Sequence, residues 1–365
     1  MSVLRVALDY RPALLGCSGI PRAVRELARA LGALAEPGLE LHLFGHSFAR
    51  GAAATAPPGT RLHRTRLPGR ALPWLRRLGL PAERLCGGAA VFHWTDFIHP
   101  PLGARTAAVL TLHDCAFAVD PALHGEDAAV LRARTERGIA RARVVVCPTH
   151  AAARDAAQWL AVPEAKLRVV PFGADHALAP VSAPHPFGGE DYVLVLGTLE
   201  PRKNQLRALA AWRALREPRP RLVVVGRRGW CDDEIVSALR DAVSRDRALW
   251  FDAADDATLA VLLTHARVLL YPSLLEGFGF PPLEALRRGV PVVAGDTPAL
   301  RETCGEDAYF CAPRDVDAIH AALERALHSD ACDASAMAAR RARAAAFRWE
   351  DCARRHAAIY REAAA

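Results

Sequence analysis

Residues 267–284 read RVLLYPSLLEGFGFPPLE, in which an apolar run, a glycine-rich turn and two prolines follow one another. Its first part, Arg267–Ser273, is short and mainly apolar, which predicts a buried strand. A glycine-rich turn around Phe278 follows, and Pro281 and Pro282 then suit the first turn of a helix, where a missing N–H costs nothing. Ligands of parallel α/β sheets bind at the carboxyl ends of the strands, which is where this turn is expected to lie.

Two carboxylates bracket this turn. Glu276 and Glu284 lie eight positions apart, and Gly277 and Gly279 on either side of Phe278 let the backbone approach a ligand closely. Surface glutamates beside a turn give the same pattern. The pair therefore indicates a binding site only in combination with the rest of the chain.

Strand-like apolar runs alternate with helical patterns twice along the chain. The first series of expected strands is 3–9, 39–44, 90–94, 107–113, 144–148 and 167–171, and the second is 192–197, 221–226, 249–253, 268–272 and 290–295. Helical patterns lie between them, at 20–34, 204–216, 233–244 and 256–265. Strands separated by helices form parallel β-α-β units with helices on both faces. We therefore expect an α/β protein with two Rossmann-like halves.

The length of 365 residues exceeds the usual size of one hydrophobic core. A stretch rich in proline, glycine and small residues, 175–189, separates the two series of strands. We therefore expect an N-terminal domain at 1–180, a linker at 181–190 and a C-terminal domain at 191–345.

Composition limits the class of protein. Apolar residues make up 52% of the chain and charged residues 24%, which is ordinary for a soluble enzyme. No apolar run approaches the length of a membrane span, and the start MSVLRVALDY enters a strand pattern directly, so we expect a cytoplasmic protein. The nine cysteines include no C-x-x-C pair and fit reduced thiols. Residues 1–180 carry 22 Lys and Arg against 14 Asp and Glu, so acidic partners should meet the first half.

Four segments of the second half carry a family resemblance. GTLEPRKN at 197–204, YPSLLEGFGFP at 271–281, EAL at 284–286 and GVPVVA at 289–294 resemble the nucleotide-sugar-dependent glycosyltransferases of family 4. That family has the GT-B fold, in which two Rossmann-like domains face each other across a cleft. Within the family, these motifs most resemble those of bacterial mannosyltransferases of O-antigen and exopolysaccharide assembly. The resemblance also implies that a last helix, at 346–365, crosses back to the first domain.

The resemblance implies a retaining hexosyltransferase of cell-surface polysaccharide biosynthesis. Its preferred donor is GDP-mannose, and its acceptor is a hydroxyl of a glycan or of a lipid-diphosphate-linked glycan. A UDP-glucose or other hexose donor, a nucleotide-sugar epimerase of the same fold and a nucleotide-sugar-binding module without transfer remain alternatives. No nucleic acid is expected as a partner.

Two cations of the second half are expected to bind the donor diphosphate. Arg202 and Lys203 follow the expected strand 192–197 and open a helix, where the macrodipole also favours anions. By resemblance, Lys203 is the diphosphate lysine. Many relatives carry an arginine in place of Thr198, and Arg202 is expected to take that role here.

The two glutamates have different tasks by resemblance. Glu276 contacts hydroxyls of the donor sugar near the reacting face, whereas Glu284 accepts both hydroxyls of the nucleotide ribose. A carboxylate suits each task because it accepts two O–H donors at once. The backbone N–H groups of Phe278, Gly279 and Phe280 are expected to meet the sugar or the distal phosphate.

The first half supplies the opposite wall by resemblance. The small-residue loop before helix 20–34 contains Ser18 and Gly19, which are expected to approach the diphosphate, and Arg22 is a candidate for the acceptor side. His113 follows the strand 107–112 and matches the family's active-site histidine near the transferred sugar. His93 is a weaker candidate for lining the acceptor cleft, since a lone histidine is more often structural.

The implied reaction needs neither a protein nucleophile nor a metal. The acceptor hydroxyl attacks the anomeric carbon on the front side, and the departing phosphate takes the acceptor proton. Two acidic pairs, Asp232–Asp233 and Asp255–Asp256, precede expected helices and read as N-terminal caps rather than as metal ligands. A glycoside hydrolase would also use paired carboxylates, but it gives no reason for Arg202 and Lys203 at a helix start.

A tryptophan, leucine and arginine mixture at 72–85 fits a surface that rests on an anionic bilayer. The alternative is a buried helix with a solvated arginine face. The basic first half agrees with peripheral contact at the cytoplasmic face of the inner membrane.

Overall fold

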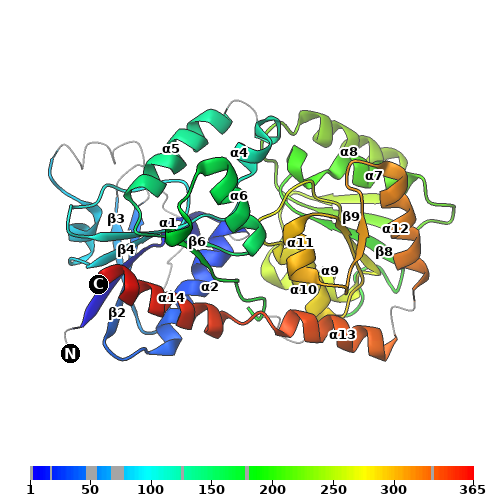
Figure 1. Cartoon of the computed structure of the whole chain (residues 1–365). Coiled ribbons are helices and arrows are strands. Elements are labelled where there is room, and N and C mark those ends of the chain that lie inside the picture. The colour runs from blue at the N-terminus through cyan, green and yellow to red at the C-terminus, as the bar shows by residue number, and fades with distance from the viewer. Residues whose placement is uncertain are drawn as a thin grey trace. The chain divides into compact units, whose positions relative to one another are not determined.

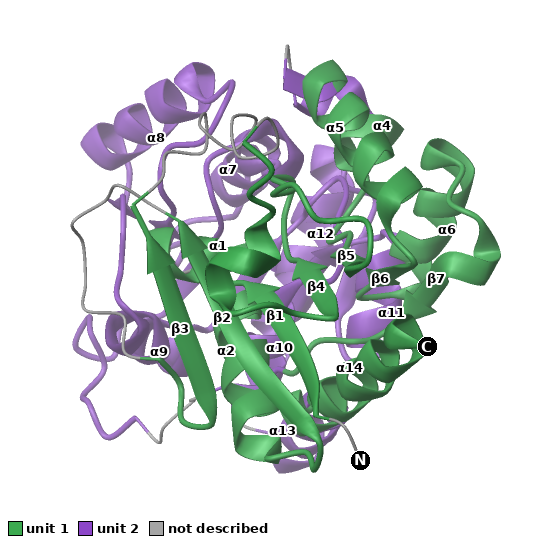
Figure 2. Ribbon diagram, turned by 90° about the vertical axis from the view of Figure 1, so that its left-hand side faces the viewer, with its two compact units in different colours: residues 1–119, 129–173, 348–365 green, residues 120–128, 174–347 purple. Residues whose placement is uncertain are grey.

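The computed structural model describes residues 3–16, 19–46, 56–66, 78–124, 127–176, 181–329 and 333–365 (Figure 1). These residues form two compact units. The first contains residues 1–119, 129–173 and 348–365, and the second contains residues 120–128 and 174–347 (Figure 2).

The first unit is built on a parallel sheet of seven strands in the order β3-β2-β1-β4-β5-β6-β7. Its strands are β1 (Leu4–Asp9), β2 (Leu39–His46), β3 (Thr60–Thr65), β4 (Val91–Trp94), β5 (Ala107–Thr111), β6 (Val144–Cys147) and β7 (Leu167–Val169). Its helices are α1 (Arg11–Leu15), α2 (Ile20–Leu34), α4 (Ala116–Val119), α5 (Ala128–Arg141), α6 (His150–Leu160) and α14 (Trp349–Ala364), with short 3-10 turns at Ala82–Cys86 and Glu164–Lys166.

The second unit is built on a parallel sheet of six strands in the order β10-β9-β8-β11-β12-β13. Its strands are β8 (Tyr192–Leu196), β9 (Arg221–Val225), β10 (Ala248–Phe251), β11 (Val268–Tyr271), β12 (Val292–Gly295) and β13 (Tyr309–Cys311). Its helices are α7 (Gln205–Arg213), α8 (Asp233–Arg245), α9 (Asp256–His265), α10 (Phe280–Arg288), α11 (Pro298–Cys304), α12 (Val316–His328) and α13 (Ala334–Ala345), with 3-10 turns at Pro121–Leu123 and Pro201–Lys203.

The inner strands of both sheets are buried on both faces, which explains their nearly continuous apolar sequences. Every residue of β8 and β11 is buried, and the core that these strands form with helices α7 and α12 includes Trp212, Leu270 and Leu323. In each sheet the strand order reverses once, between β1 and β4 and between β8 and β11. In an open α/β sheet, such a switch point leaves a crevice at the carboxyl ends of the strands.

The two expected series of strands are confirmed, and the sequence missed one strand in each sheet. Strand β3, with the sequence TRLHRT, lies at a sheet edge and has no apolar run to signal it. Strand β13 is only three residues long. The helix expected from residue 204 begins at Gln205, because Asn204 adopts a left-handed conformation with φ of 62°.

The last helix, α14, packs within the first unit. It contacts α2 and β5 and buries residues such as Trp349, His356 and Tyr360. Its partners come from the first third of the chain, although it follows the whole second unit in sequence. Among the described residues, no helix is long and apolar enough to cross a membrane.

Candidate functional site

The candidate site of the second unit lies at the switch point of its sheet. The loop after β8 carries Arg202 and Lys203, and the loop after β11 carries Glu276. Strands β8 and β11 are neighbours in the sheet, so their carboxyl ends bring these loops together. Residues that are 73 positions apart in sequence therefore meet.

These three charged groups and Glu200 form one ion cluster. The Lys203 Nζ donates to Glu276 Oε1 at 2.7 Å, and Arg202 donates to Glu276 Oε2 at 3.3 Å. Arg202 also pairs with Glu200 Oε1 at 2.7 Å. The side chains of Lys203, Arg202 and Glu276 are only 13%, 12% and 6% exposed, so water screens these charges little.

Burial and charge act in opposite directions on Glu276. Burial raises the pKa of its carboxyl, but the charges of Lys203 and Arg202 outweigh this and hold the pKa below its ordinary value. The carboxylate is therefore ionised at neutral pH.

Tyr271, at the end of β11, completes the cluster. Its hydroxyl accepts a hydrogen bond of 2.7 Å from Lys203 Nζ, which lies 5.1 Å from the centre of the ring. Burial, together with the charge of Glu276, raises the pKa of this tyrosine well above its ordinary value. The tyrosine is thus neutral, and it fixes the direction of the lysine side chain.

Glu284 makes a separate pair on α10. Its Oε1 lies 2.9 Å from His176 Nε2, and both side chains are almost fully buried. The ring of His176 packs edge-on against Phe280, the first residue of α10. The two glutamates of the motif therefore have different partners in the structure, namely cations for Glu276 and an imidazole for Glu284.

The turn between the two glutamates is conformationally demanding. Gly279 precedes α10 with φ of 92°, a left-handed conformation that favours glycine. A Cβ at this position would also lie 2.5 Å from Leu300 Cδ2. Phe278 packs against Phe280 and Phe347, with ring centres 5.1 and 5.7 Å apart. The two prolines lie in the first turn of α10, as the sequence predicts.

In the first unit, His113 lies just beyond the carboxyl end of β5. Its Nε2 is 2.8 Å from the carbonyl oxygen of Thr95. A carbonyl can only accept, so Nε2 carries the hydrogen and Nδ1 is the basic nitrogen. Burial lowers the pKa of His113, although the Thr95 hydrogen bond and Asp114 oppose this effect.

The loop before α2 is described only in part. Gly19 caps α2 with φ of 61°, a positive value that glycine adopts without strain. Arg22 lies in the first turn of the helix and is 9% exposed. Arg25 donates to the Gly16 carbonyl at 2.7 Å and so anchors the start of the loop. Ser18 lies outside the described residues.

His93 does not fit its predicted place at an acceptor surface. Its side chain is completely buried, with Nδ1 2.8 Å from the Tyr360 hydroxyl and Nε2 2.7 Å from Thr111 Oγ1. Both ring nitrogens are used internally, so no part of the ring is left to contact an acceptor.

Both acidic pairs lie at helix starts as predicted, but only Asp255 caps its helix with its side chain. Asp255 caps α9 by accepting from the Thr258 N–H at 2.8 Å. Asp232 precedes α8, but its carboxylate binds Arg228 and the Gly229 N–H instead of capping the helix. Within the described ranges no cluster of His, Cys, Asp and Glu has the arrangement of a metal site.

The segment expected to contact a membrane is mostly not described. Residues 67–77, including Trp74, Arg76 and Arg77, lie outside the described residues. Leu78 and Leu80, which follow them, are 68% and 42% exposed.

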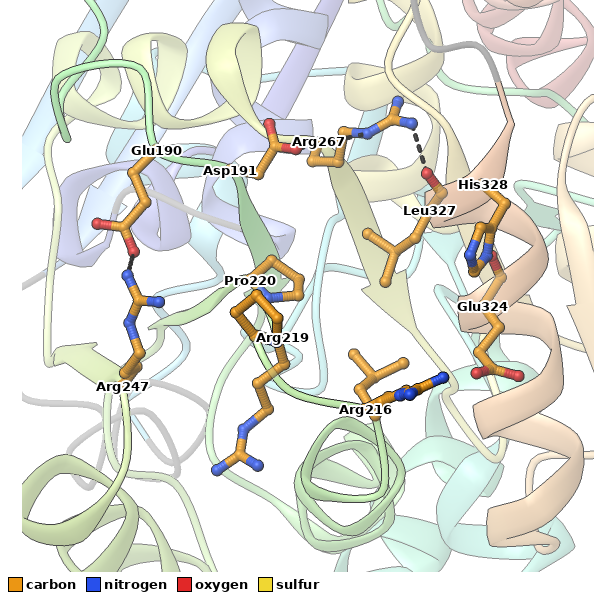
Figure 3. Close-up of a pocket in the computed structure, with 12 residues that line it drawn as sticks. Glu190, Asp191, Arg216, Arg219, Pro220, Arg247, Arg267, Glu324, Leu327 and His328 are labelled. Carbon is orange, nitrogen blue, oxygen red and sulfur yellow. Dashed lines mark hydrogen bonds and ion pairs between the residues drawn. The ribbon is translucent and has the colours of Figure 1, made fainter.

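A hollow of about 370 Å³ lies at the opposite, amino-terminal edge of the second sheet (Figure 3). Four arginines line it, and other groups already engage three of them. Arg247 pairs with Glu190, Arg219 binds Asp246 at 2.9 Å, and Arg267 donates to carbonyls at the end of α12. This hollow is therefore remote from the ion cluster and poorly suited to an anion.

The sequence does not predict the partners of the candidate residues. Tyr271 and Glu200, which hold Lys203 and Arg202, stand in an expected strand and in a family motif without a role of their own. His176, which holds Glu284, lies in the stretch rich in proline and small residues. No local pattern signals these contacts, because they join segments 68 to 108 residues apart, except for Glu200, which is near Arg202 in sequence.

Two family models match consecutive parts of the chain. Residues 17–178 match the family described as Glycosyltransferase Family 4, and residues 182–345 match the family described as Glycosyl transferases group 1. O-antigen chain mannosyltransferase B of Escherichia coli is 37% identical over 176 residues, which cover 47% of this chain and 46% of that protein. The chain thus spans about half the length of this curated relative.

Two solved structures are similar over almost the whole chain. Sucrose-phosphate synthase of Thermosynechococcus elongatus is 22% identical and covers 98% of each chain with a TM-score of 0.77. Anabaena HepE, solved in complex with UDP and glucose, is 17% identical and covers 99% of this chain and 100% of its own with a TM-score of 0.73. At these identities the likeness concerns the fold.

Proposed function

The chain belongs to the glycosyltransferases of family 4 and group 1 and has their fold of two Rossmann-like domains, and we propose that it transfers a hexose from a nucleotide sugar to a hydroxyl of a glycan or lipid-linked glycan. The preferred donor is GDP-mannose, and the setting is cell-surface polysaccharide biosynthesis. The similarity to an O-antigen mannosyltransferase supports mannose.

One observation carries this proposal: two largely buried cations and two carboxylates meet at the switch point of the second sheet. Lys203 and Arg202 share Glu276 as a counter-ion, so both cations become available to a phosphate when this one carboxylate moves away. Glu200 pairs with Arg202 from the other side. A departing nucleoside diphosphate develops negative charge, and preorganised cations stabilise it.

In the proposed mechanism the diphosphate displaces Glu276 from the cations. Without donor, the carboxylate is the counter-ion of Lys203 and Arg202 at 2.7 and 3.3 Å. When phosphate oxygens take over these donors, the Glu276 carboxylate becomes available to hydroxyls of the donor sugar. Tyr271 keeps its hydrogen bond to Lys203 and holds the ammonium in place during the exchange.

The remaining residues receive the roles that the family pattern implies. Glu284 accepts the ribose hydroxyls, and its hydrogen bond to His176 orients the carboxylate. The backbone N–H groups of Gly279 and its neighbours meet the sugar or the distal phosphate. His113 acts near the transferred sugar with a neutral ring, and Ser18 and Gly19 approach the diphosphate.

The proposed chemistry is a front-side displacement with retention of configuration. The acceptor oxygen bonds to the anomeric carbon, the bond from that carbon to the leaving phosphate breaks, and the leaving phosphate takes the acceptor proton. No protein nucleophile and no metal ion take part.

A glucose donor is the second candidate. HepE has the same fold and was solved with UDP and glucose, so the fold accommodates that donor class. A panel of nucleotide sugars in a thermal-shift assay separates the two donors, because a ligand that binds only the folded state raises the melting temperature. We expect GDP-mannose to give the largest shift. A larger shift with UDP-glucose would contradict GDP-mannose and indicate UDP-glucose as the donor.

Transfer itself is tested with labelled donor and a lipid-diphosphate-linked acceptor. The proposal predicts label in the acceptor only when both substrates are present. Donor conversion without acceptor would instead identify an epimerase, and binding without any conversion would identify a binding module.

We also propose cytoplasmic localisation with peripheral contact to an anionic bilayer through the basic first half. Sedimentation with vesicles of phosphatidylglycerol and phosphatidylethanolamine tests this. Reversing the charges of Arg76 and Arg77 should reduce co-sedimentation and activity on the lipid-linked acceptor. Unchanged sedimentation and activity would refute the membrane contact.

A further inference from the structure

The last helix of the chain places two polar side chains in the interior of the first unit. Helix α14 packs beside β1, β4 and β5, all within one unit (Figure 2). Most of its buried face is apolar, but Tyr360 and His356 are polar and completely buried. Burial of polar groups is costly unless they are hydrogen-bonded, so both side chains are expected to have polar partners within the unit.

Tyr360 of α14 begins a chain of hydrogen bonds that crosses from β4 to β5. Its hydroxyl lies 2.8 Å from His93 Nδ1, and His93 Nε2 lies 2.7 Å from Thr111 Oγ1. The exposed fractions of Tyr360, His93 and Thr111 are 0%, 0% and 5%. Each of these groups has a partner, and a satisfied buried network rigidifies its surroundings and specifies a single arrangement.

This chain forms the first rung of a ladder between β4 and β5. His93 pairs in register with Val109, so Thr111 is two residues beyond its register partner. The second rung is the hydrogen bond from His113 Nε2 to the Thr95 carbonyl at 2.8 Å. Thr95 lies two residues after His93, and His113 lies two residues after Thr111. Each rung therefore repeats the same diagonal step, and the first fixes the strand ends that carry the second.

Helix α14 supports the second rung as well. The ring of His113 lies 5.6 Å from that of Phe172, and Phe172 lies 5.8 Å from Trp349, the first residue of α14. A Cβ on Gly173 would lie 2.3 Å from the Trp349 backbone nitrogen, so the two segments are in close contact. The two ends of α14 thus brace the two rungs.

We propose that Tyr360 and His93 are positioning residues that hold the His113 imidazole through the two-rung ladder between β4 and β5. This inference rests on the proposed function in one respect, namely that His113 acts on the donor. It gives His93 a role that its complete burial allows.

The test compares two buried tyrosines. Tyr360→Phe removes the first hydroxyl of the ladder. The matched control is Tyr192→Phe, because Tyr192 is also completely buried and its hydroxyl donates to the Leu262 carbonyl at 2.6 Å in the other unit. Both changes should lower the melting temperature by similar amounts, since each removes one buried hydrogen bond.

Only Tyr360→Phe should lower kcat, by about tenfold, with the KM for the donor unchanged, because a small misplacement of a reacting group affects turnover. Thr111→Val breaks the same rung, so combining it with Tyr360→Phe should cost little more than either change alone. Equal kcat losses in Tyr360→Phe and Tyr192→Phe would overturn the proposal, as would additive losses in the double variant.

Imidazole ¹⁵N spectra provide a readout that needs no transfer activity. The His113 signals, assigned with His113→Gln, should show the Nε2–H tautomer in the wild type and in Tyr192→Phe, and a changed shift in Tyr360→Phe. Unchanged His113 signals in Tyr360→Phe would overturn the ladder even if no donor were found. A changed signal in a protein that transfers nothing would uphold the ladder and refute the proposed function.

Discussion

Replacing Glu276 with glutamine should have opposite effects on nucleotide binding and on turnover. Glu276→Gln preserves the shape of the side chain and removes its charge, so Lys203 and Arg202 lose the counter-ion that they share at 2.7 and 3.3 Å. If the diphosphate displaces this carboxylate, the variant should bind GDP more tightly. If the carboxylate then holds the donor sugar, the variant should transfer it more slowly.

The distances allow a rough estimate of the binding effect. Two unit charges 2.7 Å apart attract by about 6 kcal/mol at an effective dielectric constant of about 20. The phosphate contacts are the same in wild type and variant, so the difference is the cost of breaking the Glu276 pairs, and the solvation that the freed carboxylate regains offsets most of that cost. Arg202 keeps Glu200 at 2.7 Å in both. We therefore expect a net gain of about 1.4 kcal/mol, or tenfold in the Kd of GDP.

The turnover effect should be larger. Hydrogen bonds from hydroxyls to a charged acceptor contribute about 1.5–3 kcal/mol each. Loss of the charge should therefore lower kcat by about 100-fold.

Calorimetric titration with GDP and initial rates with labelled donor measure the two effects separately. The comparison variant is Glu284→Gln, whose carboxylate pairs with His176. That variant should not gain affinity for GDP. Weaker GDP binding by Glu276→Gln, or a wild-type kcat, would refute the ion-exchange mechanism.

Four further outcomes are expected. Lys203→Ala should cost about 2–5 kcal/mol of transition-state stabilisation in kcat/KM, whereas Lys166→Ala should leave it unchanged; equal losses would argue against a diphosphate role. Glu284→Ala should raise the KM for the donor more than it lowers kcat, and the reverse pattern would contradict a ribose contact. Gly279→Ala should lower the free energy of unfolding by about 1–3 kcal/mol in urea titrations, because of the positive φ and the contact with Leu300; a neutral effect would contradict the strained turn. The pKa of Glu276 in the folded protein lies below its ordinary value of 4.5. Its contribution to the free energy of unfolding should therefore be complete above pH 4.5 and be lost as the pH falls through the folded pKa. A difference in the free energy of unfolding between wild type and Glu276→Gln that does not shrink from pH 7 to pH 3 would contradict this.

The sequence predicted the alternation of strands and helices because each central strand is a continuous apolar run. Runs such as Val193–Leu196 are buried on both faces, and burial of this kind leaves a clear pattern. The edge strand β3 consists almost entirely of polar residues, and β13 is only three residues long, so neither gives an apolar run that predicts a strand. Helix α7 begins one residue later than predicted, because the backbone of Asn204 is in the left-handed conformation. A helical pattern of apolar residues does not reveal this conformation.

The candidate site was predictable to the extent that its residues share short motifs. Glu276, Glu284 and Lys203 stand in such motifs, and the structure brings Glu276 and Lys203 into contact. Their partners Tyr271 and His176 depend on how distant segments meet, and a local pattern contains no such information. The same holds for His93, whose burial follows from the packing of α14 near the other end of the chain.

The chain contains only two lysines, which makes the diphosphate site directly observable. In protein labelled with ¹³C-lysine, the Lys203 side chain gives one signal and Lys166, which donates to the Ile139 carbonyl in the first unit, gives the other. A Lys166→Arg variant assigns them. Addition of GDP-mannose should shift the Lys203 signal as it leaves Glu276 for phosphate, and the Lys166 signal should not move. Binding of the nucleotide, verified by thermal shift, with an unmoved Lys203 signal would contradict the assignment of this cluster to the donor diphosphate.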